Sequence, residues 1–343
     1  MTAAPSEDIL FLDRTAVITA LTGVDTLDVI AQVLTEHAAG RVALPEEGYL
    51  AWSNSQGAYS RSIAMQGGLT GERPVYGMKL INASVSNPAR GMERAGGLSF
   101  LFDPETARPV MIAEAAYLSA IRTGAYTMLS LRHLGPAEWD AVSMIGCGTQ
   151  ARAHLDLIAQ VFPEVRRVHV VDREPARAEG FADWVRTSHP AIKPVVEQNV
   201  RAAVGAAPVV ITLTTSDEPY IPASWIQPGS FLAHVSLADF TEDVFVGAQA
   251  LYIDDLDLIR DNPRRIMGGL IADGVIADAP GKPGRAIDGT LGQVLCGETE
   301  PIRPGTGYVL SNPFGMSILD VGMIDAVHGS AVRLNVGQRL SML

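Results

Sequence analysis

The sequence predicts an α/β protein, with a doubly wound parallel sheet joined to a second region of α+β type. From about residue 140 to 255, short apolar runs alternate with helical patterns, as in parallel sheets that helices cover on both faces. Residues 48–112 instead contain strand-length runs separated by turn signals, which is typical of a mostly antiparallel sheet. The chain has 343 residues, which is long enough for two domains.

The composition restricts the class of protein. Hydrophobic residues make up 47% and charged residues 19%, which indicates a globular chain and not a disordered one. A net charge of -12 argues against nucleic-acid binding, which normally needs a basic face. The N-terminus lacks the basic segment of a signal peptide, no apolar run is long enough to span a membrane, and Cys147 and Cys296 are too few for a disulfide framework. We therefore expect a cytoplasmic protein without membrane or nucleic-acid partners.

The first region starts with a β-like run over 8–21 and a helix over 25–40, whose apolar positions fall on one face and which Gly40 ends. Five strands are then expected, at 48–52, 61–67, 74–84, 96–103 and 108–114. A helix follows over 114–134, because its apolar residues recur at helical spacing and Gly135 with Pro136 ends it.

The parallel sheet begins with a strand at 141–146 and a helix that runs to about residue 161. The further elements expected are strands at 167–172, 209–215, 230–237 and 250–255, and a helix around 175–185. The tail over 315–334 returns to a helical pattern, and we expect it to pack back on the first region. These patterns place the nucleotide-binding domain at 123–312 and the other domain at 1–122 with 313–343.

A glycine motif opens the parallel sheet. Gly146, Gly148 and Ala151 in "GCGTQA" follow the G-x-G-x-x-G/A spacing that places a pyrophosphate on a helix N-terminus. The motif follows a strand, opens a helix, and precedes a second strand that ends in Asp172, where a ribose 2′-OH ligand is expected. In this context the motif predicts a Rossmann-type domain that binds a dinucleotide.

Asp172 favours NAD, because a carboxylate repels the 2′-phosphate of NADP, although Arg173 and Arg177 leave NADP open. Thr214 follows a later strand, at the edge of the sheet where ligands bind in such folds. The alternative for its hydroxyl is a cap on the next turn. The cofactor contacts expected in this domain are Gly146, Gly148, Thr149, Gln150, Asp172 and Thr214.

Three polar residues stand in apolar surroundings: Lys79 in "VYGMKLI", Arg122 in "SAIRTGA" and Asp239 in "HVSLADF". Each also has a purely structural interpretation, as a solvated strand face, a surface helix position and a helix N-cap respectively. The motifs of zinc proteases and serine hydrolases are absent, and we expect no metal. His154 and His234 are better explained as structural residues with satisfied hydrogen bonds.

The motifs "GMK", "AIRTGA", "MIGCGTQA", "SLADF" and "NPFGMSILD" occur in this order, and as a set they resemble the ornithine cyclodeaminase/mu-crystallin family from about residue 40 to 330. "SLADF" together with "NPFGMSILD" is most similar to the branch that makes 2,3-diaminopropionate. The resemblance implies an NAD-dependent dehydrogenase that oxidises the secondary amine of N-(2-amino-2-carboxyethyl)-L-glutamate. Hydrolysis of the imine then releases 2-oxoglutarate and 2,3-diaminopropionate.

The resemblance also implies roles for single residues. Lys79 and Arg122 match the residues that bind the substrate carboxylate, and Asp239 matches the catalytic aspartate. Lys79 is expected to be a catalytic residue as well. The further cofactor contacts implied are Arg122, Thr123, Ser236 and Leu237. Homologues pair through the β region, so a homodimer is expected, with substrate bound between the two domains.

Three positions depart from the family pattern, and one of them is Pro313, near which a cofactor-contacting serine of cyclodeaminases aligns. The other two concern the substrate. Ala51 stands where the diaminopropionate branch has an arginine, so one anchor for a second carboxylate is missing. Either Arg41, Arg61 or Arg94 replaces it, or the substrate carries fewer carboxylates. Ala64 stands where cyclodeaminases have a glutamate that holds ornithine, which argues against ornithine. The rival functions are an imine or ketimine reductase, an alanine dehydrogenase, a cyclodeaminase, and a nucleotide-binding protein without turnover.

Overall fold

The structure is a computed structural model that describes residues 8–262 and 265–341. The chain divides into two compact units, and each is described here by itself. The first unit comprises residues 1–122 and 316–343, and the second comprises residues 123–315. The sequence places the second boundary three residues earlier, at 312/313.

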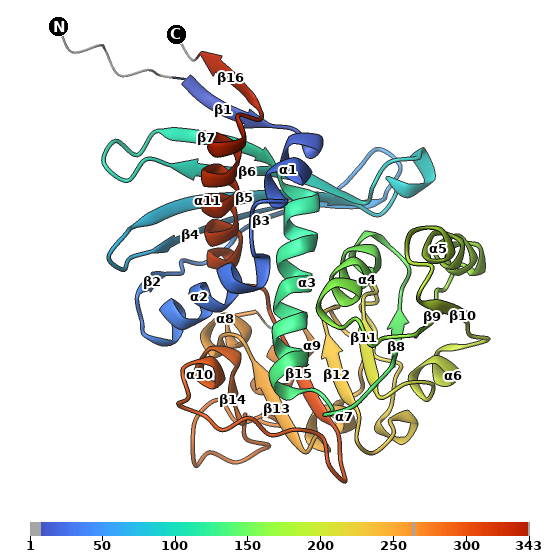
Figure 1. Ribbon diagram of the computed structural model, residues 1–343. Coiled ribbons are helices and arrows are strands. Elements are labelled where there is room, and N and C mark those ends of the chain that lie inside the picture. The colour runs from blue at the N-terminus through green and yellow to red at the C-terminus, as the bar shows by residue number, and fades with distance from the viewer. Residues whose placement is uncertain (1–7, 263–264, 342–343) are drawn as a thin grey trace, which may run out of the picture. The chain divides into compact units, whose positions relative to one another are not determined.

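The first unit is built on one sheet (Figure 1). Its strands are β1 (Asp8–Leu12), β2 (Val42–Ala43), β3 (Gly48–Ser53), β4 (Tyr59–Leu69), β5 (Val75–Ser84), β6 (Ala95–Phe102), β7 (Pro109–Glu114) and β16 (Gln338–Ser341). The order is β16-β1-β7-β6-β5-β4-β2, with β3 also paired to β4. Only β1 and β7 pair in parallel among these strands, which confirms the mostly antiparallel sheet.

The long C-terminal helix α11 (Ser317–Leu334) belongs to the first unit and packs on β4, β5 and β6. It also contacts α1 (Arg14–Leu21) and α2 (Thr26–Ala38). Glycine is needed where the helix crosses the sheet, because a Cβ at Gly67 would lie 2.7 Å from Ser317 Oγ. The prediction that the tail packs back on the first region is confirmed.

The prediction of a β-like run over 8–21 is wrong for its second half, because residues 14–21 form α1. The β-branched residues of "TAVITAL" favour strand locally. Asp13 overrides this preference, because its side chain caps the helix by accepting a hydrogen bond from the Ala16 N–H at 2.8 Å. Val17 and Ala20 are fully buried on the inner face of α1.

The second unit contains an eight-stranded, all-parallel sheet, which confirms the predicted α/β class. The strands are β8 (Ala141–Ile145), β9 (Arg167–Val171), β10 (Lys193–Val196), β11 (Val209–Thr212), β12 (Phe231–His234), β13 (Ala250–Ile253), β14 (Gly289–Thr290) and β15 (Val309–Asn312). Their order is β10-β9-β8-β11-β12-β15-β13-β14. The strand order reverses direction between β8 and β11, which is where doubly wound sheets bind ligands.

The helices α4 (Thr149–Val161) and α5 (Pro175–Ser188) connect the first three strands. The shorter helices are α6 (Val200–Val204), α7 (Glu242–Val246), α8 (Leu256–Arg260), α9 (Ile266–Ala272) and α10 (Leu291–Leu295). The helix α3 (Ala115–Leu134) starts in the first unit and continues into the second. Strands β8, β11, β12 and β13 are buried along their whole length, as expected for parallel strands covered on both faces.

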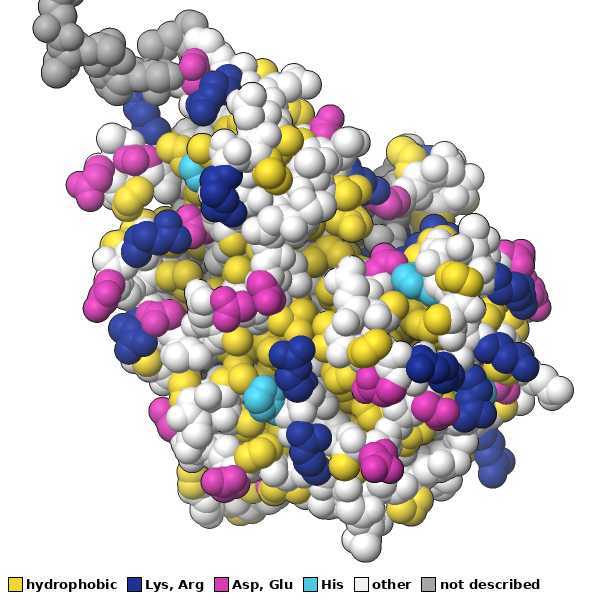
Figure 2. Space-filling view, viewed as in Figure 1, with side chains coloured by type: hydrophobic (Ala, Val, Ile, Leu, Met, Phe, Trp, Pro, Cys, Tyr) yellow, Lys and Arg dark blue, Asp and Glu magenta, His cyan; other side chains and the backbone are white. Residues whose placement is uncertain are grey.

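On the face shown in Figure 2, acidic and basic side chains are interspersed with apolar ones. Among the described residues, no single helix has the length and apolarity needed to cross a membrane. Helices α1 and α2 reach that threshold only when counted as one pair, and an 86° bend separates them.

Candidate active site

The turn after β8 has the geometry that the glycine motif requires. Gly146 has a φ of +101°, and a Cβ there would lie 2.9 Å from the Leu213 carbonyl oxygen at the end of β11. Its N–H donates to the Val171 carbonyl at 2.8 Å. Any other residue at this position would be strained and would push β8 and β11 apart.

The second and third motif positions also fit a bound pyrophosphate. Gly148 is the N-cap of α4, and no atom lies within 4 Å of the Cβ position it lacks, so the backbone is open to a ligand. Ala151 is fully buried, which lets the helix pack closely on the sheet. Gln150 Oε1 is buried in the first turn of α4 and has no hydrogen-bond partner among the described residues. The turn therefore suits a dinucleotide at the N-terminus of α4.

Asp172 lies beside this turn. Its carboxylate accepts hydrogen bonds from the Cys147 N–H and the Glu174 N–H, both at 2.9 Å, which fixes the side chain at the end of β9. It remains partly exposed, as a ligand for a ribose hydroxyl must be. Arg177, which left NADP open, forms an exposed ion pair with Glu174 at 3.0 Å. This arrangement favours NAD.

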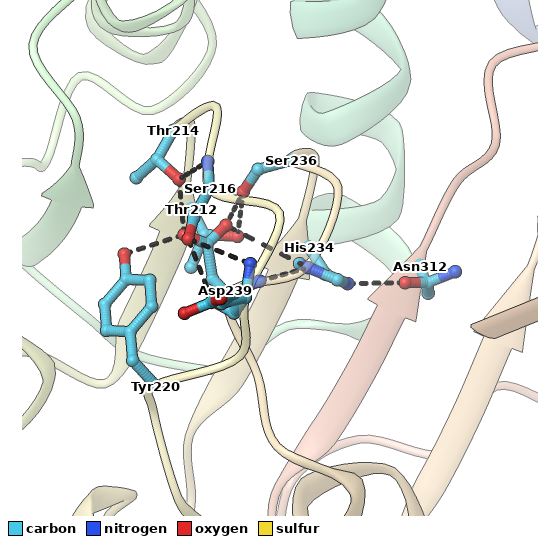
Figure 3. A network of polar contacts seen from close by, with 9 residues as sticks. Thr212, Thr214, Ser216, Tyr220, His234, Ser236, Asp239 and Asn312 are labelled. Carbon is cyan, nitrogen blue, oxygen red and sulfur yellow. Dashed lines mark hydrogen bonds and ion pairs between the residues drawn. The ribbon is translucent and has the colours of Figure 1, made fainter. Parts of the chain in front are cut away.

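Asp239 is the centre of a polar network at the carboxyl edge of the parallel sheet (Figure 3). Its side chain is completely buried. Oδ1 accepts hydrogen bonds from Thr214 Oγ1 at 2.5 Å and Tyr220 Oη at 2.7 Å, and Oδ2 accepts one from Ser236 Oγ. Ser236 Oγ also lies 2.8 Å from Thr212 Oγ1. A carboxylate has about four acceptor positions, so one is left for a substrate proton.

His234 holds the backbone of Asp239 in place. Its Nε2 accepts a hydrogen bond from the Asp239 N–H at 3.2 Å, so Nδ1 carries the proton and donates to Asn312 Oδ1 at 2.6 Å. Burial lowers the pKa of His234, which keeps the ring neutral and this tautomer in place. The ring nitrogens of His154 are also satisfied, by Gln150 O and Thr127 Oγ1. Both histidines thus have the satisfied hydrogen bonds that are expected from the sequence.

Tyr220 is a member of the network that the sequence does not reveal. Its backbone N–H donates to the Asp239 carbonyl at 2.9 Å, and its hydroxyl donates to the Asp239 carboxylate. Burial and then the charge of Asp239 raise the pKa of Tyr220 far above its usual value, so the phenol stays a donor. Only its position after "TTSDEP", in the connection between β11 and β12, hints at the role.

Lys79 and Arg122 come together in the first unit, through a residue that the sequence did not single out. Asp320 of α11 accepts a hydrogen bond from Lys79 Nζ at 2.7 Å on Oδ2 and from Arg122 Nε at 3.0 Å on Oδ1. The exposed fractions of these side chains are 3% for Lys79, 3% for Asp320 and 8% for Arg122. We call Lys79, Arg122 and Asp320 the cation pair cluster.

The cluster combines two buried cations with one carboxylate, so a positive charge is left over when all three are ionised. Burial and then the charge of Arg122 lower the pKa of Lys79 to about 8. The charges of Asp320 and Glu47 oppose this lowering. Ser119 Oγ lies 3.3 Å from Lys79 Nζ. Ser99 faces Lys79 on β6, and its hydroxyl is buried without a hydrogen-bond partner among the described residues. A carboxylate ligand would supply the partner that the Ser99 hydroxyl lacks.

The strand register places Ala51 and Ala64, which both depart from the family pattern, on opposite faces of the sheet. Cross-strand partners share a face, and Ala51, Arg61 and Ala83 form one row on the face that carries Lys79. Ala64 pairs with Leu80, so it lies on the opposite face. The missing glutamate at Ala64 therefore does not alter the sheet face that carries Lys79, whereas the missing arginine at Ala51 does.

The structure thus places the predicted residues in two groups. Asp239, Thr214 and Ser236 lie in one network, with Leu237 in the same loop, and Asp172, Gly146 and Gly148 lie around the turn with Thr149 and Gln150. Lys79 and Arg122 belong to the other unit. These site residues stay predictions, together with Thr123 on α3.

A dinucleotide-binding sheet with a buried carboxylate at its ligand edge defines a class of nicotinamide-dependent enzyme, and comparison with known proteins names the family. The model of the ornithine cyclodeaminase/mu-crystallin family matches residues 8–335. The chain belongs to this family.

Three relatives illustrate the similarity. N-((2S)-2-amino-2-carboxyethyl)-L-glutamate dehydrogenase of Staphylococcus aureus is 30% identical over 318 residues, which are 92% of this chain and 93% of that protein. The crystal structure of CmnK is 54% identical, with a TM-score of 0.92, and the match covers 98% of this chain and 99% of that one. An archaeal alanine dehydrogenase dimer with bound NAD is 22% identical, with a TM-score of 0.83 and coverage of 98% and 100%. The similarity to the alanine dehydrogenase shows the fold alone.

At the level of the family, the predicted class of oxidoreductase, acting on amine or imine groups, is confirmed. The predicted family itself is confirmed as well.

Proposed function

We propose that the protein is an NAD-dependent dehydrogenase that oxidises the secondary amine of an N-substituted amino acid of the N-(2-amino-2-carboxyethyl)-L-glutamate type. The product is an imine, which water hydrolyses to a 2-oxo acid and 2,3-diaminopropionate. The observation that carries the proposal is the buried, hydroxyl-bonded carboxylate of Asp239 at the ligand edge of a dinucleotide-binding sheet. Similarity to the dehydrogenase of Staphylococcus aureus supports the substrate.

The cation pair cluster binds the carboxylate next to the carbon that is oxidised. A guanidinium and an ammonium held in a buried site bind a carboxylate through charge-assisted hydrogen bonds. Asp320 accepts hydrogen bonds from Arg122 Nε and Lys79 Nζ. These bonds orient the remaining N–H donors of the two side chains. Ser99 adds a hydroxyl on the same face. The cation pair cluster therefore selects amino acids and oxo acids over amines that lack a carboxylate.

Asp239 accepts the proton of the substrate amine, so that the nitrogen lone pair is free when hydride leaves the neighbouring carbon. Thr214, Tyr220 and Ser236 hold its two oxygens in fixed directions. After that proton has passed to solvent, the same carboxylate takes a proton from the water that attacks the imine.

NAD, held by the turn of Gly146 and Gly148 and by Asp172, supplies the hydride acceptor when bound. The chain's own contribution is to place the donor carbon and to move protons. We propose that this cofactor is NAD and not NADP, because Asp172 is fixed at the end of β9.

The protein is proposed to act as a cytoplasmic homodimer. On the sheet face opposite to Lys79, Leu50 and Trp52 of β3 are 64% and 46% exposed, and Leu98 of β6 is also exposed. Such an apolar sheet face is typical of an interface between subunits. Light scattering during size-exclusion chromatography tests this, and a monomer at micromolar concentration would reject it.

The test of the function is to incubate protein and NAD with a panel of N-substituted amino acids, and to follow NADH absorbance and product mass. We expect NADH, 2-oxoglutarate and 2,3-diaminopropionate from N-(2-amino-2-carboxyethyl)-L-glutamate. No NADH from any secondary amine, with consumption of NADPH by cyclic imines, would favour a reductase instead. Binding of NAD without turnover of any substrate would favour a binding protein.

A further inference from the structure

A proton on the carboxylate of Asp239 has no direct contact with solvent, because this side chain is completely buried. Oδ1 accepts hydrogen bonds from Thr214 Oγ1 at 2.5 Å and Tyr220 Oη at 2.7 Å, and Ser236 Oγ bonds Oδ2. In the proposed reaction the substrate amine takes the acceptor position that remains. A proton received from the amine is therefore blocked by the substrate on that side, and it leaves through one of the hydroxyls.

The hydroxyls on the two oxygens of Asp239 lead in different directions. Ser236 leads inward, since its Oγ lies 2.8 Å from Thr212 Oγ1 and both residues are buried. Thr214 and Tyr220, which share Oδ1, are only half-buried, and residues 217–219 directly before Tyr220 are exposed. The route from Asp239 to solvent therefore starts at Oδ1.

Backbone bonds hold Tyr220 in place independently of its hydroxyl, which points to Asp239 (Figure 3). The Tyr220 N–H and the Ile221 N–H both donate to the Asp239 carbonyl at 2.9 Å. The Thr241 N–H returns to the Ile221 carbonyl at 3.0 Å, and Ile221 forms a parallel bridge with Phe240. Tyr220→Phe keeps the ring and these bonds, so it removes one hydroxyl and leaves the fold intact.

The phenol suits proton transfer better than the alcohol of Thr214. Burial and then the charge of Asp239 raise the pKa of Tyr220, so the phenol is neutral while Asp239 is ionised. When Asp239 takes up a proton, its charge disappears and so does this contribution to the pKa of Tyr220. The phenol then gives up its own proton more readily, and a phenol with its ordinary pKa of about 10 is a stronger acid than an aliphatic alcohol.

We propose that Tyr220 is the proton outlet of Asp239. While Asp239 is ionised, the Tyr220 hydroxyl donates to Oδ1. Once Asp239 holds the amine proton, the phenol turns its hydrogen outward and its oxygen accepts the hydrogen bond of the acid. The O–H bond of Asp239 then breaks as one forms on Tyr220 Oη, and the phenol's own proton passes to water or to a buffer base. Asp239 is again a carboxylate, the phenol is neutral, and nothing is oxidised or reduced.

This inference rests on the proposed function, in which Asp239 loses the amine proton before it takes a proton from water. The test is stopped-flow measurement of NADH formation from N-(2-amino-2-carboxyethyl)-L-glutamate by the full-length wild type and by Tyr220→Phe. We expect the variant to form NADH equal to its active sites at nearly the wild-type rate, because the first proton only has to reach Asp239. Later turnovers should be about 10²-fold slower, as when a positioned proton-transfer group is lost. Imidazole, raised at constant pH and ionic strength, should restore them.

Ser236→Ala is the matched control, because it removes a hydroxyl from the other oxygen of Asp239 on the inward branch. A hydroxyl that only positions Asp239 affects the first hydride transfer as well, so Ser236→Ala should show no burst of NADH and no response to imidazole. Thr214→Ala should behave like Ser236→Ala. Rescue of Thr214→Ala by imidazole without rescue of Tyr220→Phe would overturn the inference.

Two further results count against the outlet. In one, the first turnover of Tyr220→Phe is slowed as much as its steady state, and in the other, imidazole leaves its rate unchanged. Either result, with NADH formed by the wild type, would reject the outlet alone. A wild type that forms no NADH from any secondary amine would reject the proposed function and the outlet with it.

Discussion

Asp320→Asn is the substitution whose effect the structure predicts most directly. Asp320 accepts hydrogen bonds from both Lys79 and Arg122, and all three side chains are nearly inaccessible to solvent. Asparagine keeps the size but removes the negative charge, so two buried cations lose their partner. Breaking a buried ion pair on one side costs about 3–5 kcal/mol, because the remaining charge stays desolvated.

The magnitude depends on pH in a defined direction. Lys79 can lose its proton more easily than Arg122, since its pKa is already lowered to about 8. Without Asp320 the pKa of Lys79 should fall further, which removes one of the uncompensated charges. We therefore expect the loss in the free energy of unfolding to be largest near pH 6 and smaller near pH 9.

The assay is urea unfolding followed by circular dichroism, with ligand-free wild type as reference. Asp325→Asn on the same helix is the matched control, because its partner Arg73 is exposed and such a pair contributes about 0–1 kcal/mol. The two variants remove the same charge from α11. If Asp320→Asn loses no more stability than Asp325→Asn, the cluster is not the buried, coupled group described here.

The remaining predictions concern chemistry, titration and the cofactor turn. Asp239→Asn should lower kcat by about 10²- to 10⁴-fold with NAD affinity unchanged, and NADH formation at the wild-type rate would remove Asp239 from the mechanism. Affinity for 2-oxo acids should fall as pH rises through about 8, because Lys79 loses its charge there, and Lys79→Met should bind weakly at every pH. Because the pKa of Lys79 is lower in the folded protein than its ordinary 10.5, the unfolded chain binds the extra proton between these values. Wild type should therefore gain up to about 3 kcal/mol in unfolding free energy from pH 8 to 10.5 relative to Lys79→Met, and a parallel pH dependence of the two proteins would contradict this. Gly146→Ala should weaken NAD binding and destabilise the protein by about 1–3 kcal/mol, because its φ is positive. Gly180→Ala in α5, where no atom crowds the added Cβ, is the control and should be neutral or stabilising. Calorimetric titration measures NAD binding of the two variants, and thermal unfolding measures their stability.

The sequence predicts those parts of the fold that depend on local pattern. Alternating apolar runs and the motif around Gly146 identify the parallel sheet, and turn signals separate the antiparallel strands. The helix α1 is not predicted, because its β-branched residues favour a strand. The cap at Asp13 and the burial of Val17 stabilise the helix instead. That burial depends on neighbours far away in the sequence.

The candidate site divides in the same way. Lys79, Arg122 and Asp239 are visible as polar residues within apolar segments. Asp320 is not, because an aspartate in the first turn of a helix is explained by the helix dipole alone, and its partner Lys79 is 241 residues away. The opposition of Ala51 and Arg61 depends on the strand register, which short strands do not encode locally.

The origin of the transferred hydride tests the central claim most directly. N-(2-amino-2-carboxyethyl)-L-glutamate carrying deuterium at the glutamate Cα is incubated with the protein and NAD, and the reduced cofactor is analysed by mass spectrometry. Oxidation at this carbon predicts one deuterium in each reduced nicotinamide, and unlabelled 2,3-diaminopropionate in equal amount. Reduced cofactor without deuterium, or no reduced cofactor at all, would contradict the account.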